Sequence, residues 1–453
     1  MSKHYHLIGI GGIGMSGIAR LLIRRGIKVS GSDVKESKIT GELKGLGAHI
    51  FIGHEPKNID GADVVVYSSA IKEDNPEIIE SKKLDISLIK RAQALAQLMQ
   101  EKTVITVTGS HGKTTTTSLA SWLLLEAGLL PTMAIGGVMK NIDTNASFGE
   151  GDFFVAEADE SDGSFLYYQP KYSIITNIDY EHLDYYKNFQ NILDAFSKFL
   201  HKTESSGCLF CCSDDANLRQ LTKDYKNRCV FFGLKDGADI YPRNIKINGF
   251  SSSFDCFYKD EFIANFLLAL GGEHNISNAL AVIALARELK IDLEITKRAL
   301  SGYKGAWRRL DIKFRDKKYT LIDDYAHHPT EIKATLSAIR RLEAKRVIAI
   351  FQPHRYSRTK LLLEDFGRSF DLADYVIITD IYPASELPIE GVSGVSICDK
   401  IKQYDPAKQT EFLPKKKIVE HVMGILRPGD LVVTLGAGDI IKNCDELVEE
   451  LKR

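Results

Sequence analysis

The stretch of sequence that decides the fold reads Thr103-Val-Ile-Thr-Val-Thr-Gly-Ser-His-Gly-Lys-Thr-Thr-Thr-Thr117. Its first six residues are all β-branched, which predicts a buried strand. A loop bounded by glycines follows, and residues 118–125 predict a helix with Leu119, Trp122 and Leu123 on its apolar side. Glycines let backbone N–H groups approach an anion, and the helix N-terminus adds positive charge. The stretch therefore predicts a phosphate-binding loop.

The side chains of this loop suit a nucleoside triphosphate. Lys113 can reach the β- and γ-phosphates, and the Thr114 hydroxyl can ligate Mg²⁺. Three residues separate Gly109 from Lys113, where the common P-loop has five. An ordinary strand–turn–helix with a surface lysine is the alternative, but the coincidence of loop, lysine and threonine run after one strand favours ATP. The expected ATP-binding residues of the loop are Gly109, Ser110, His111, Gly112, Lys113, Thr114 and Thr115.

Composition and charge argue against several classes of partner. The 453 residues suffice for about three domains. The net charge of −1 offers no broad attraction to nucleic acid or an anionic membrane. No apolar run approaches the roughly eighteen residues of a membrane span, no signal peptide is evident, and seven scattered cysteines favour buried reduced thiols. We therefore expect a cytoplasmic protein without nucleic-acid or membrane partners, as a monomer or weak homodimer.

Alternating strands and helices predict three α/β domains. They are residues 1–100, 101–309 and 310–453, and the first and third are Rossmann-like while the central one is of the P-loop type. Further strands are expected at residues 6–10, 27–30, 63–67, 153–156, 172–176, 207–212, 321–322, 346–351, 375–379 and 431–435. Helices are expected at residues 14–25, 92–99, 189–200, 274–289 and 329–342, with a β-rich insertion at residues 236–260.

A second glycine loop lies near the N-terminus, in Gly9-Ile-Gly-Gly-Ile-Gly14, and Asp33 follows close to the second predicted strand. Alone, this spacing indicates an NAD-dependent oxidoreductase. However, a glycine turn at a helix N-terminus accepts any pyrophosphate, including that of a nucleotide sugar. Asp33 can equally hold a ribose or a uracil, so the loop leaves both ligand classes open.

Two acidic runs, residues 157–162 and 179–184, each follow a predicted strand beside the phosphate loop. Parallel sheets bind their ligands at the carboxyl ends of strands, so these runs predict ligands for Mg²⁺ bound with ATP. His182 lies within the second run. Histidine is an unusual magnesium ligand, and a packing or capping role for His182 is the alternative.

Polar residues recur later in the chain. Asn275 and Asn278 share a helix face suited to a purine edge, although asparagine also commonly caps helices. Loops at residues 323–329, 351–358 and 436–439 each follow a predicted strand and should converge on one edge of the third domain. The arginines in these loops suit carboxylate recognition.

The ordered set of motifs resembles the Mur ligases of peptidoglycan synthesis from end to end. The motifs are GIGGIGMSGIA (9–19), TVTGSHGKTTTT (106–117), EADESDGSFL (157–166), TNIDYEHLD (176–184), GEHNISNALA (272–281), WRRLD (307–311), DDYAHHPTE (323–331), FQPHRYSRT (351–359) and GAGDI (436–440). The resemblance implies ATP-driven amide formation: the lactyl carboxylate of UDP-N-acetylmuramate becomes an acyl phosphate, which the amine of L-alanine attacks.

The resemblance also implies roles for particular residues. Catalysis would involve Lys113, Glu157, His182 and Arg308. Mg²⁺ would be held by Thr114, Glu157 and His182. Besides the loop, ATP would contact Asn275, Asn278, Arg308 and Asp323. The UDP group would be held by Gly11, Gly12, Ile13, Gly14, Asp33, His54, Ser68 and Arg91. The amino acid and sugar would face Tyr325, His327, His328, His354 and Arg355.

Three alternatives stay open. A related UDP-muramyl peptide ligase of the same family would share most of these motifs. A nicotinamide oxidoreductase is supported only by the first glycine loop and Asp33, and leaves the Lys113 loop and the acidic runs without a purpose. A non-enzymatic nucleotide-binding protein is disfavoured because Lys113, Glu157 and His182 are all present.

Overall fold

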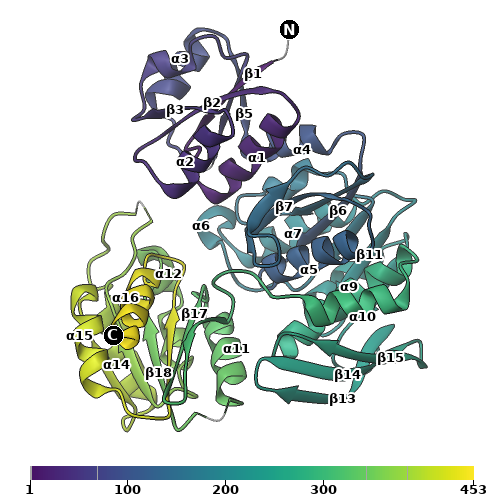
Figure 1. Cartoon of the computed structure of the whole chain (residues 1–453). Coiled ribbons are helices and arrows are strands. Elements are labelled where there is room, and N and C mark those ends of the chain that lie inside the picture. The colour runs from purple at the N-terminus through teal and green to yellow at the C-terminus, as the bar shows by residue number, and fades with distance from the viewer. Residues whose placement is uncertain (1–2, 69, 343, 385) are drawn as a thin grey trace. The chain divides into compact units, whose positions relative to one another are not determined.

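The computed structural model describes residues 3–68, 70–342, 344–384 and 386–453, and contains sheets of five, ten and six strands (Figure 1). The chain clusters into two compact units. The first comprises residues 1–245, 254–269 and 275–305, and the second comprises residues 246–253, 270–274 and 306–453. Because the expected first and central domains fall within one unit, the boundary near residue 100 stays a prediction.

The first sheet is entirely parallel, in the order β3-β2-β1-β4-β5. Its elements are β1 (His4–Ile8), α1 (Ile13–Arg24), β2 (Lys28–Asp33), α2 (Lys38–Gly45), β3 (His49–Ile52), η1 (Pro56–Ile59), β4 (Val64–Tyr67), α3 (Pro76–Lys83), β5 (Ser87–Lys90) and α4 (Arg91–Met99). The strand predicted at residues 6–10 ends earlier because Gly9 turns the chain with φ +74°. Parallel pairing brings the carboxyl ends of all five strands to one edge.

The central sheet runs β15-β14-β13-β12-β11-β10-β6-β9-β7-β8. Its strands are β6 (Thr103–Thr108), β7 (Thr132–Met139), β8 (Thr144–Ser147), β9 (Phe153–Glu157), β10 (Tyr172–Ile175), β11 (Cys208–Cys212), β12 (Cys229–Phe232), β13 (Ile240–Asn248), β14 (Ser251–Tyr258) and β15 (Glu261–Leu268). The associated helices are α5 (Lys113–Glu126), η2 (Ser164–Tyr167), α6 (Leu183–Tyr186), α7 (Phe189–Leu200), α8 (Ala216–Thr222), α9 (Glu273–Glu288) and α10 (Leu293–Gly302). The β-rich insertion expected at residues 236–260 is therefore present and extends further.

Helix α5 begins at Lys113, five residues before the predicted start at residue 118. The threonine run disfavours a helix by propensity, because β-branched side chains lose rotamer freedom there. In the structure the hydroxyls instead bond back to carbonyls one turn earlier: Thr117 Oγ1 donates to Lys113 O at 2.8 Å and Ser118 Oγ to Thr114 O at 2.7 Å. Tertiary burial of the run thus overrides the local preference.

The third sheet runs β16-β17-β21-β18-β19-β20 and is parallel except for β16, which pairs antiparallel with β17. Its elements are β16 (Asp311–Arg315), β17 (Tyr319–Asp324), α11 (Pro329–Arg340), β18 (Arg346–Phe351), α12 (Tyr356–Leu361), α13 (Leu363–Gly367), β19 (Tyr375–Ile378), α14 (Gly394–Tyr404), β20 (Gln409–Phe412), η3 (Lys415–Lys417), α15 (Ile418–Ile425), β21 (Asp430–Leu435) and α16 (Ile441–Lys452). Separate apolar clusters cover its two faces, as a doubly wound sheet requires. Pro329 is the first residue of α11, as predicted.

All seven cysteines are free, and Cys208, Cys211 and Cys212 are buried in β11. This confirms the strand and the burial of the thiols expected there. Among the described residues, no helix combines the length and apolarity that crossing a membrane requires.

The core of the central sheet includes a cluster of three fully buried phenylalanines. The ring centroid of Phe165 lies 4.8 Å from that of Phe199 and 5.3 Å from that of Phe196. Replacing Phe196 by alanine removes its contact with Phe165 and leaves a cavity, so we expect the free energy of unfolding to fall by about 3–5 kcal/mol. Denaturant unfolding measures the change. Phe262→Ala is the matched control, because Phe262 is 59% exposed and its loss should change stability by less than about 0.5 kcal/mol.

Candidate active site

The loop between β6 and α5 requires its two glycines. Gly109 has φ +127°, and a Cβ there would lie 2.2 Å from Thr176 Oγ1. Gly112 has φ +82°, and a Cβ there would lie 2.7 Å from Asn278 Oδ1. Asn177 fixes the loop from the other side: its carbonyl accepts the N–H of Ser110 at 3.0 Å. The loop therefore packs against the ends of β10 and α9 with no room for side chains at either glycine.

Lys113 folds back beneath this loop. Its ammonium group donates to Gly109 O at 2.6 Å, to Ser110 O at 3.2 Å and to Glu160 Oε1 at 2.8 Å. Burial lowers the pKa of Lys113, but the carboxylates of Glu160 and Asp159 outweigh burial and raise the pKa above its ordinary value. The loop thus holds a permanent positive charge where a phosphate group would bind.

Thr114, in the first turn of α5, and Glu157, at the end of β9, form an oxygen-rich pair. Thr114 Oγ1 donates to Glu157 Oε1 at 3.2 Å, and the N–H of Gly136 donates to Glu157 Oε2 at 2.7 Å. Burial raises the pKa of Glu157. A hydroxyl and a carboxylate side by side are the ligand types that Mg²⁺ prefers, so this pair fits that ion.

His182 lies beside Glu160. Its Nε2 is 3.1 Å from Glu160 Oε1 and 3.7 Å from Glu181 Oε2, and these three residues could together hold a metal ion. Burial lowers the pKa of His182, but the hydrogen bond and charge of Glu160 outweigh it and raise the pKa. His182 was predicted to lie near Glu157, and Glu160 was predicted only as a member of the acidic run at residues 157–162, without a role of its own. Glu160 stands three residues after Glu157 in the same acidic run, but only the tertiary fold shows that it contacts both Lys113 and His182.

The second oxygen of the Glu160 carboxylate is a further candidate metal ligand. Its Oε2 is buried and has no hydrogen-bond partner among the described residues. An unpaired buried carboxylate oxygen is costly, and a bound cation would satisfy it. The residues present therefore fit Mg²⁺ at this position as well.

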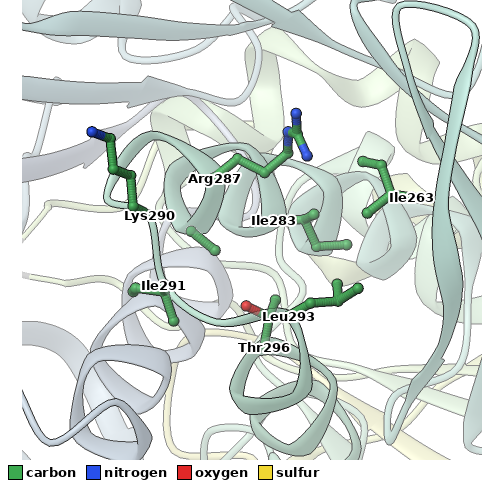
Figure 2. A pocket seen from close by; sticks show the side chains of 8 residues that line it. Ile263, Ile283, Arg287, Lys290, Ile291, Leu293 and Thr296 are labelled. Atoms are coloured by element: carbon green, nitrogen blue, oxygen red, sulfur yellow. The ribbon is translucent and has the colours of Figure 1, made fainter.

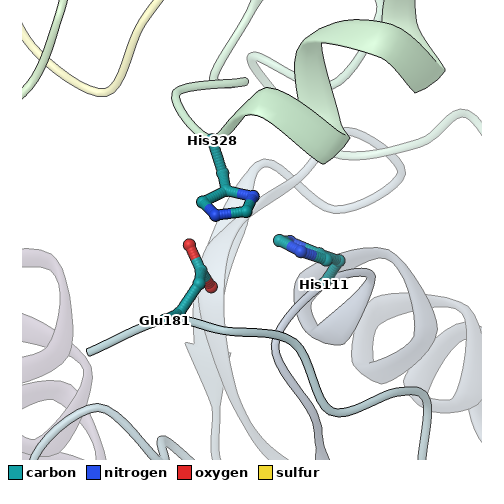
Figure 3. Close-up of side chains that lie close together, drawn as sticks. All are labelled: His111, Glu181 and His328. Atoms are coloured by element: carbon teal, nitrogen blue, oxygen red, sulfur yellow. The ribbon is translucent and has the colours of Figure 1, made fainter. Parts of the chain in front are cut away.

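His111 occupies the middle of the phosphate loop and faces the acidic run after β10. Its Nε2 lies 2.9 Å from Asp179 Oδ2, and its ring and the Glu181 carboxylate offer ligand atoms within 4.8 Å of each other (Figure 3). His328, drawn in the same figure, belongs to the second compact unit, where its Nδ1 accepts the N–H of Thr330 at 3.3 Å and caps α11.

Asn275 and Asn278 are both buried in the first turns of α9. They lie three residues apart and so share a face, and the contact of Asn278 with Gly112 brings that face to the phosphate loop. An adenine contact for this pair stays a prediction.

The residues predicted to hold the UDP group gather at the carboxyl edge of the first sheet. The N–H of Gly11 donates to Asp33 Oδ2 at 2.9 Å, and a Cβ on Gly14 would lie 2.7 Å from Arg91 Nη1. Arg91 Nη2 in turn lies 3.6 Å from Asp159 Oδ2. Gly12 precedes α1 as its N-cap, Ile13 begins α1, His54 follows β3 and Ser68 follows β4. The structure thus brings the glycine loop, Asp33 and Arg91 into one cluster.

In the second compact unit, Arg308 and Asp323 bind each other. Arg308 Nε donates to Asp323 Oδ2 at 2.9 Å, and Arg308 Nη2 donates to Gly436 O at 2.6 Å. Both residues therefore have partners within their own compact unit. Their expected contacts with ATP stay predictions.

The residues expected to face the amino acid form a ring cluster. The ring centroid of His327 lies 5.4 Å from that of Tyr325 and 5.7 Å from that of His354. Burial and the neighbouring His327 lower the pKa of His354 to about 2, so this imidazole is neutral. Arg355 has φ +71° and is held by Tyr382, whose carbonyl accepts its N–H at 2.8 Å. An arginine held in a left-handed conformation indicates a functional constraint.

A cavity of about 290 Å³ lies elsewhere in the protein, where β15 meets α9 and α10 (Figure 2). Its lining contains none of the predicted site residues. The lining residues are Ile263, Ile283, Ala286, Arg287, Lys290, Ile291, Leu293 and Thr296.

Comparison with known proteins identifies the class. Residues 4–103 match the Mur ligase family catalytic domain, residues 107–286 match the Mur ligase middle domain, and residues 308–438 match the Mur ligase glutamate ligase domain. Together with the full-length relatives below, these matches show that the chain belongs to the Mur ligase family, whose members depend on ATP.

Within this family, the chain is similar to particular enzymes over its full length. The chain is 45% identical over 447 residues to the UDP-N-acetylmuramate–L-alanine ligase of Geotalea uraniireducens, covering 99% of this chain and 98% of the relative. It is 44% identical over 451 residues to the enzyme of the same name from Persephonella marina, covering 99% and 97%. Among solved structures, the UDP-N-acetylmuramate–alanine ligase of Thermotoga maritima superposes with a TM-score of 0.86 at 30% identity over 99% of both chains. A murein peptide ligase of Psychrobacter arcticus follows with a TM-score of 0.74 at 25% identity over 99% of both chains.

The role of His182 as a metal ligand can be tested by mutation. If His182 helps to hold a metal ion, His182→Ala should leave ATP binding and the melting temperature near normal while lowering kcat by about 10²–10³, the usual effect of losing one preorganised electrostatic group. Turnover and melting temperature are measured on one preparation. His201→Ala, which removes an exposed histidine after α7, should change neither quantity. A destabilised variant with normal turnover would assign His182 to packing instead.

Proposed function

We propose that the protein joins L-alanine to the lactyl carboxylate of UDP-N-acetylmuramate in an ATP-dependent reaction of peptidoglycan precursor synthesis. The observation that carries the proposal is the identity of 43–45% over 99% of the chain to relatives that all bear the name of this ligase. The buried Lys113–Glu160 pair beneath a glycine loop, with Glu157 and His182 beside it, supports the ATP-dependent step.

In the proposed reaction the carboxylate attacks the γ-phosphate and ADP leaves. The amine of L-alanine then attacks the resulting acyl phosphate, and phosphate leaves from a tetrahedral intermediate. Negative charge grows on phosphoryl oxygens and then on the tetrahedral oxygen, so the site needs cations more than a dedicated base. Lys113 supplies one such charge to the β- and γ-phosphates.

Thr114 and Glu157 would hold one Mg²⁺, and His182 with the acidic residues near it would hold a second. When bound, these ions would neutralise phosphoryl charge. Asn275 and Asn278 would face the adenine. Arg308, with Asp323, would complete the contacts to ATP.

The remaining assignments follow the sequence analysis. We propose domain boundaries near residues 100 and 310. The first domain would bind the UDP group, and the third would bind the amino acid through Tyr325, His327, His328, His354 and Arg355. The near-zero net charge is consistent with a cytoplasmic enzyme that needs neither nucleic acid nor a membrane, as a monomer or weak homodimer.

The proposal is tested by phosphate release from Mg²⁺–ATP across a panel of acceptors and amino acids. Release should require UDP-N-acetylmuramate and L-alanine together, and UDP-muramyl peptides should not replace the acceptor. A thermal-shift assay addresses the oxidoreductase alternative, because UDP-sugars and Mg²⁺–ATP should stabilise the protein whereas NAD(H) should not. Stabilisation by NAD(H) with no phosphate release would overturn the proposal.

Asp33 provides a prediction for the first domain. Asp33→Ala removes the acceptor for the Gly11 N–H and the carboxylate expected to hold the uridine, so the KM for UDP-N-acetylmuramate should rise about tenfold or more. The KM for ATP should change far less, because the phosphate loop keeps all its contacts. Initial-rate kinetics with each substrate varied in turn measure both. Glu36→Ala, at an exposed acid three residues further on, is the control, and a collapse of ATP affinity would refute the assignment.

Arg355 provides a prediction for the third domain. Its guanidinium can pair bidentately with a carboxylate, so Arg355→Ala should raise the KM for L-alanine about tenfold or more and leave ATP binding nearly intact. Kinetics with L-alanine varied measure the effect, and the exposed Lys360→Ala is the control for loss of a nearby positive charge. Unchanged kinetics for the amino acid and the UDP substrate would remove Arg355 from the site.

A further inference from the structure

The first domain contains a buried carboxylate that none of the assignments above uses. Glu77 of α3 is fully buried. Its Oε1 accepts a hydrogen bond from Asn58 Nδ2 at 2.6 Å, and its Oε2 accepts one from Ser32 Oγ at 2.6 Å. Burial raises the pKa of Glu77, but the nearby His6 imidazole and these two hydrogen bonds outweigh burial and lower the pKa. Glu77 is therefore ionised at neutral pH and acts only as an acceptor.

This carboxylate decides which nitrogen of His54 carries a hydrogen. His54 Nδ1 lies 3.0 Å from Ser32 Oγ and 3.3 Å from Glu77 Oε2. A serine hydroxyl has one hydrogen, and the 2.6 Å contact assigns it to Glu77. Ser32 Oγ and Glu77 Oε2 thus both present lone pairs to Nδ1. Nδ1 must carry a hydrogen and donate it, and in the Nδ1–H tautomer the lone pair lies on Nε2.

His54 stands where the nucleotide is expected. Ser32 and Phe51 are paired in neighbouring strands β2 and β3, and His54 follows three residues after Phe51 at the carboxyl edge of the sheet. Asp33, which directly follows Ser32, holds the N–H of Gly11 in the glycine loop. The His54 side chain keeps 17% of its surface exposed while that of Glu77 is fully covered, so only the histidine can meet a ligand.

We propose that Glu77 is a positioning residue of the nucleotide site, which through Ser32 holds His54 in its Nδ1–H form so that Nε2 accepts a hydrogen bond from the uridine. The inference rests on the proposed function, in which the first domain binds the UDP group. Uridine offers hydrogens from uracil N3 and from the ribose hydroxyls, and either one can meet the lone pair on Nε2.

Glu77→Gln tests the proposal because it reverses the hydrogen bonds. With the amide oxygen facing the Asn58 donor, the amide NH₂ of glutamine faces Ser32 and donates to it. The Ser32 hydrogen then turns to His54 Nδ1 and moves the ring to its Nε2–H form, which cannot accept from uridine. The KM for UDP-N-acetylmuramate should rise about 10- to 100-fold, the effect of one lost hydrogen bond with its partner left unpaired. The values of kcat and of the KM for ATP should change less than about twofold.

Two matched variants test whether Glu77 acts by positioning His54 or only by stabilising the fold. Ser81 Oγ donates to the backbone carbonyl of Glu77 at 2.6 Å, so Ser81→Ala disturbs the same helix without touching the carboxylate. It should lower the melting temperature and leave the KM unchanged. In a His54→Ala background, Glu77→Gln should raise the KM no further, because the residue through which it acts is gone.

Direct measurement of the His54 tautomer keeps the proposal testable even if Glu77→Gln does not fold. The ¹⁵N shifts of histidine-labelled protein, with the His54 signals assigned by their loss in His54→Ala, should show the Nδ1–H form in the unsubstituted protein. Binding of N3-methyl-UDP and of 2′- and 3′-deoxy-UDP identifies the donor, because the analogue that lacks it should bind the unsubstituted protein and Glu77→Gln equally well.

The opposite results overturn the inference. They are an Nε2–H form of His54 in the unsubstituted protein, an unchanged KM in folded Glu77→Gln, or an equal further rise of the KM in the His54→Ala background. Failure of the proposed function is distinguishable, because the unsubstituted protein would then release no phosphate with UDP-N-acetylmuramate and L-alanine.

Discussion

The ion pair between Lys113 and Glu160 determines how the centre of the candidate site is built. A buried cation and a buried anion are each costly unless they are paired and hydrogen-bonded. Lys113 meets this demand by also binding the carbonyls of Gly109 and Ser110, which ties the phosphate loop to its own lysine. The Glu160 carboxylate, besides binding Lys113, also contacts His182. Three separate segments, the loop, the end of β9 and the run after β10, are therefore joined by one pair of charges.

The regular elements were largely predictable from the sequence. The β-branched and apolar runs predicted β6, β9, β18 and β21 to within one residue at each end, because buried parallel strands need continuous apolar sequence. Short or half-buried strands such as β3, β5 and β8 were not predicted. They are four residues long and carry little pattern of their own, so pairing with neighbouring strands holds them in place.

The sequence predicted many of the residues of the candidate site, but not which of their side chains contact each other. Acidic runs at strand ends identified Glu157 and His182, and glycine spacing identified both loops. Glu160 was predicted only as one member of an acidic run, and Glu77 was not singled out, because their importance lies in which distant side chains they contact. Glu160 contacts Lys113, and Glu77 contacts Ser32 and His54. An acidic residue in a loop has the same sequence pattern whether its side chain faces water or a buried partner. Only the tertiary contacts distinguish the two cases.

The buried thiols of Cys208, Cys256 and Cys444 also allow local unfolding of the protein to be measured. Burial raises the pKa of Cys208 in β11, of Cys256 in β14 and of Cys444 in α16, in each case to about 12. Alkylating reagents react with thiolates, so these cysteines are inert until the surrounding structure separates and exposes them. The rate at which each cysteine becomes labelled thus measures local unfolding of the strand or helix that contains it, without any introduced probe.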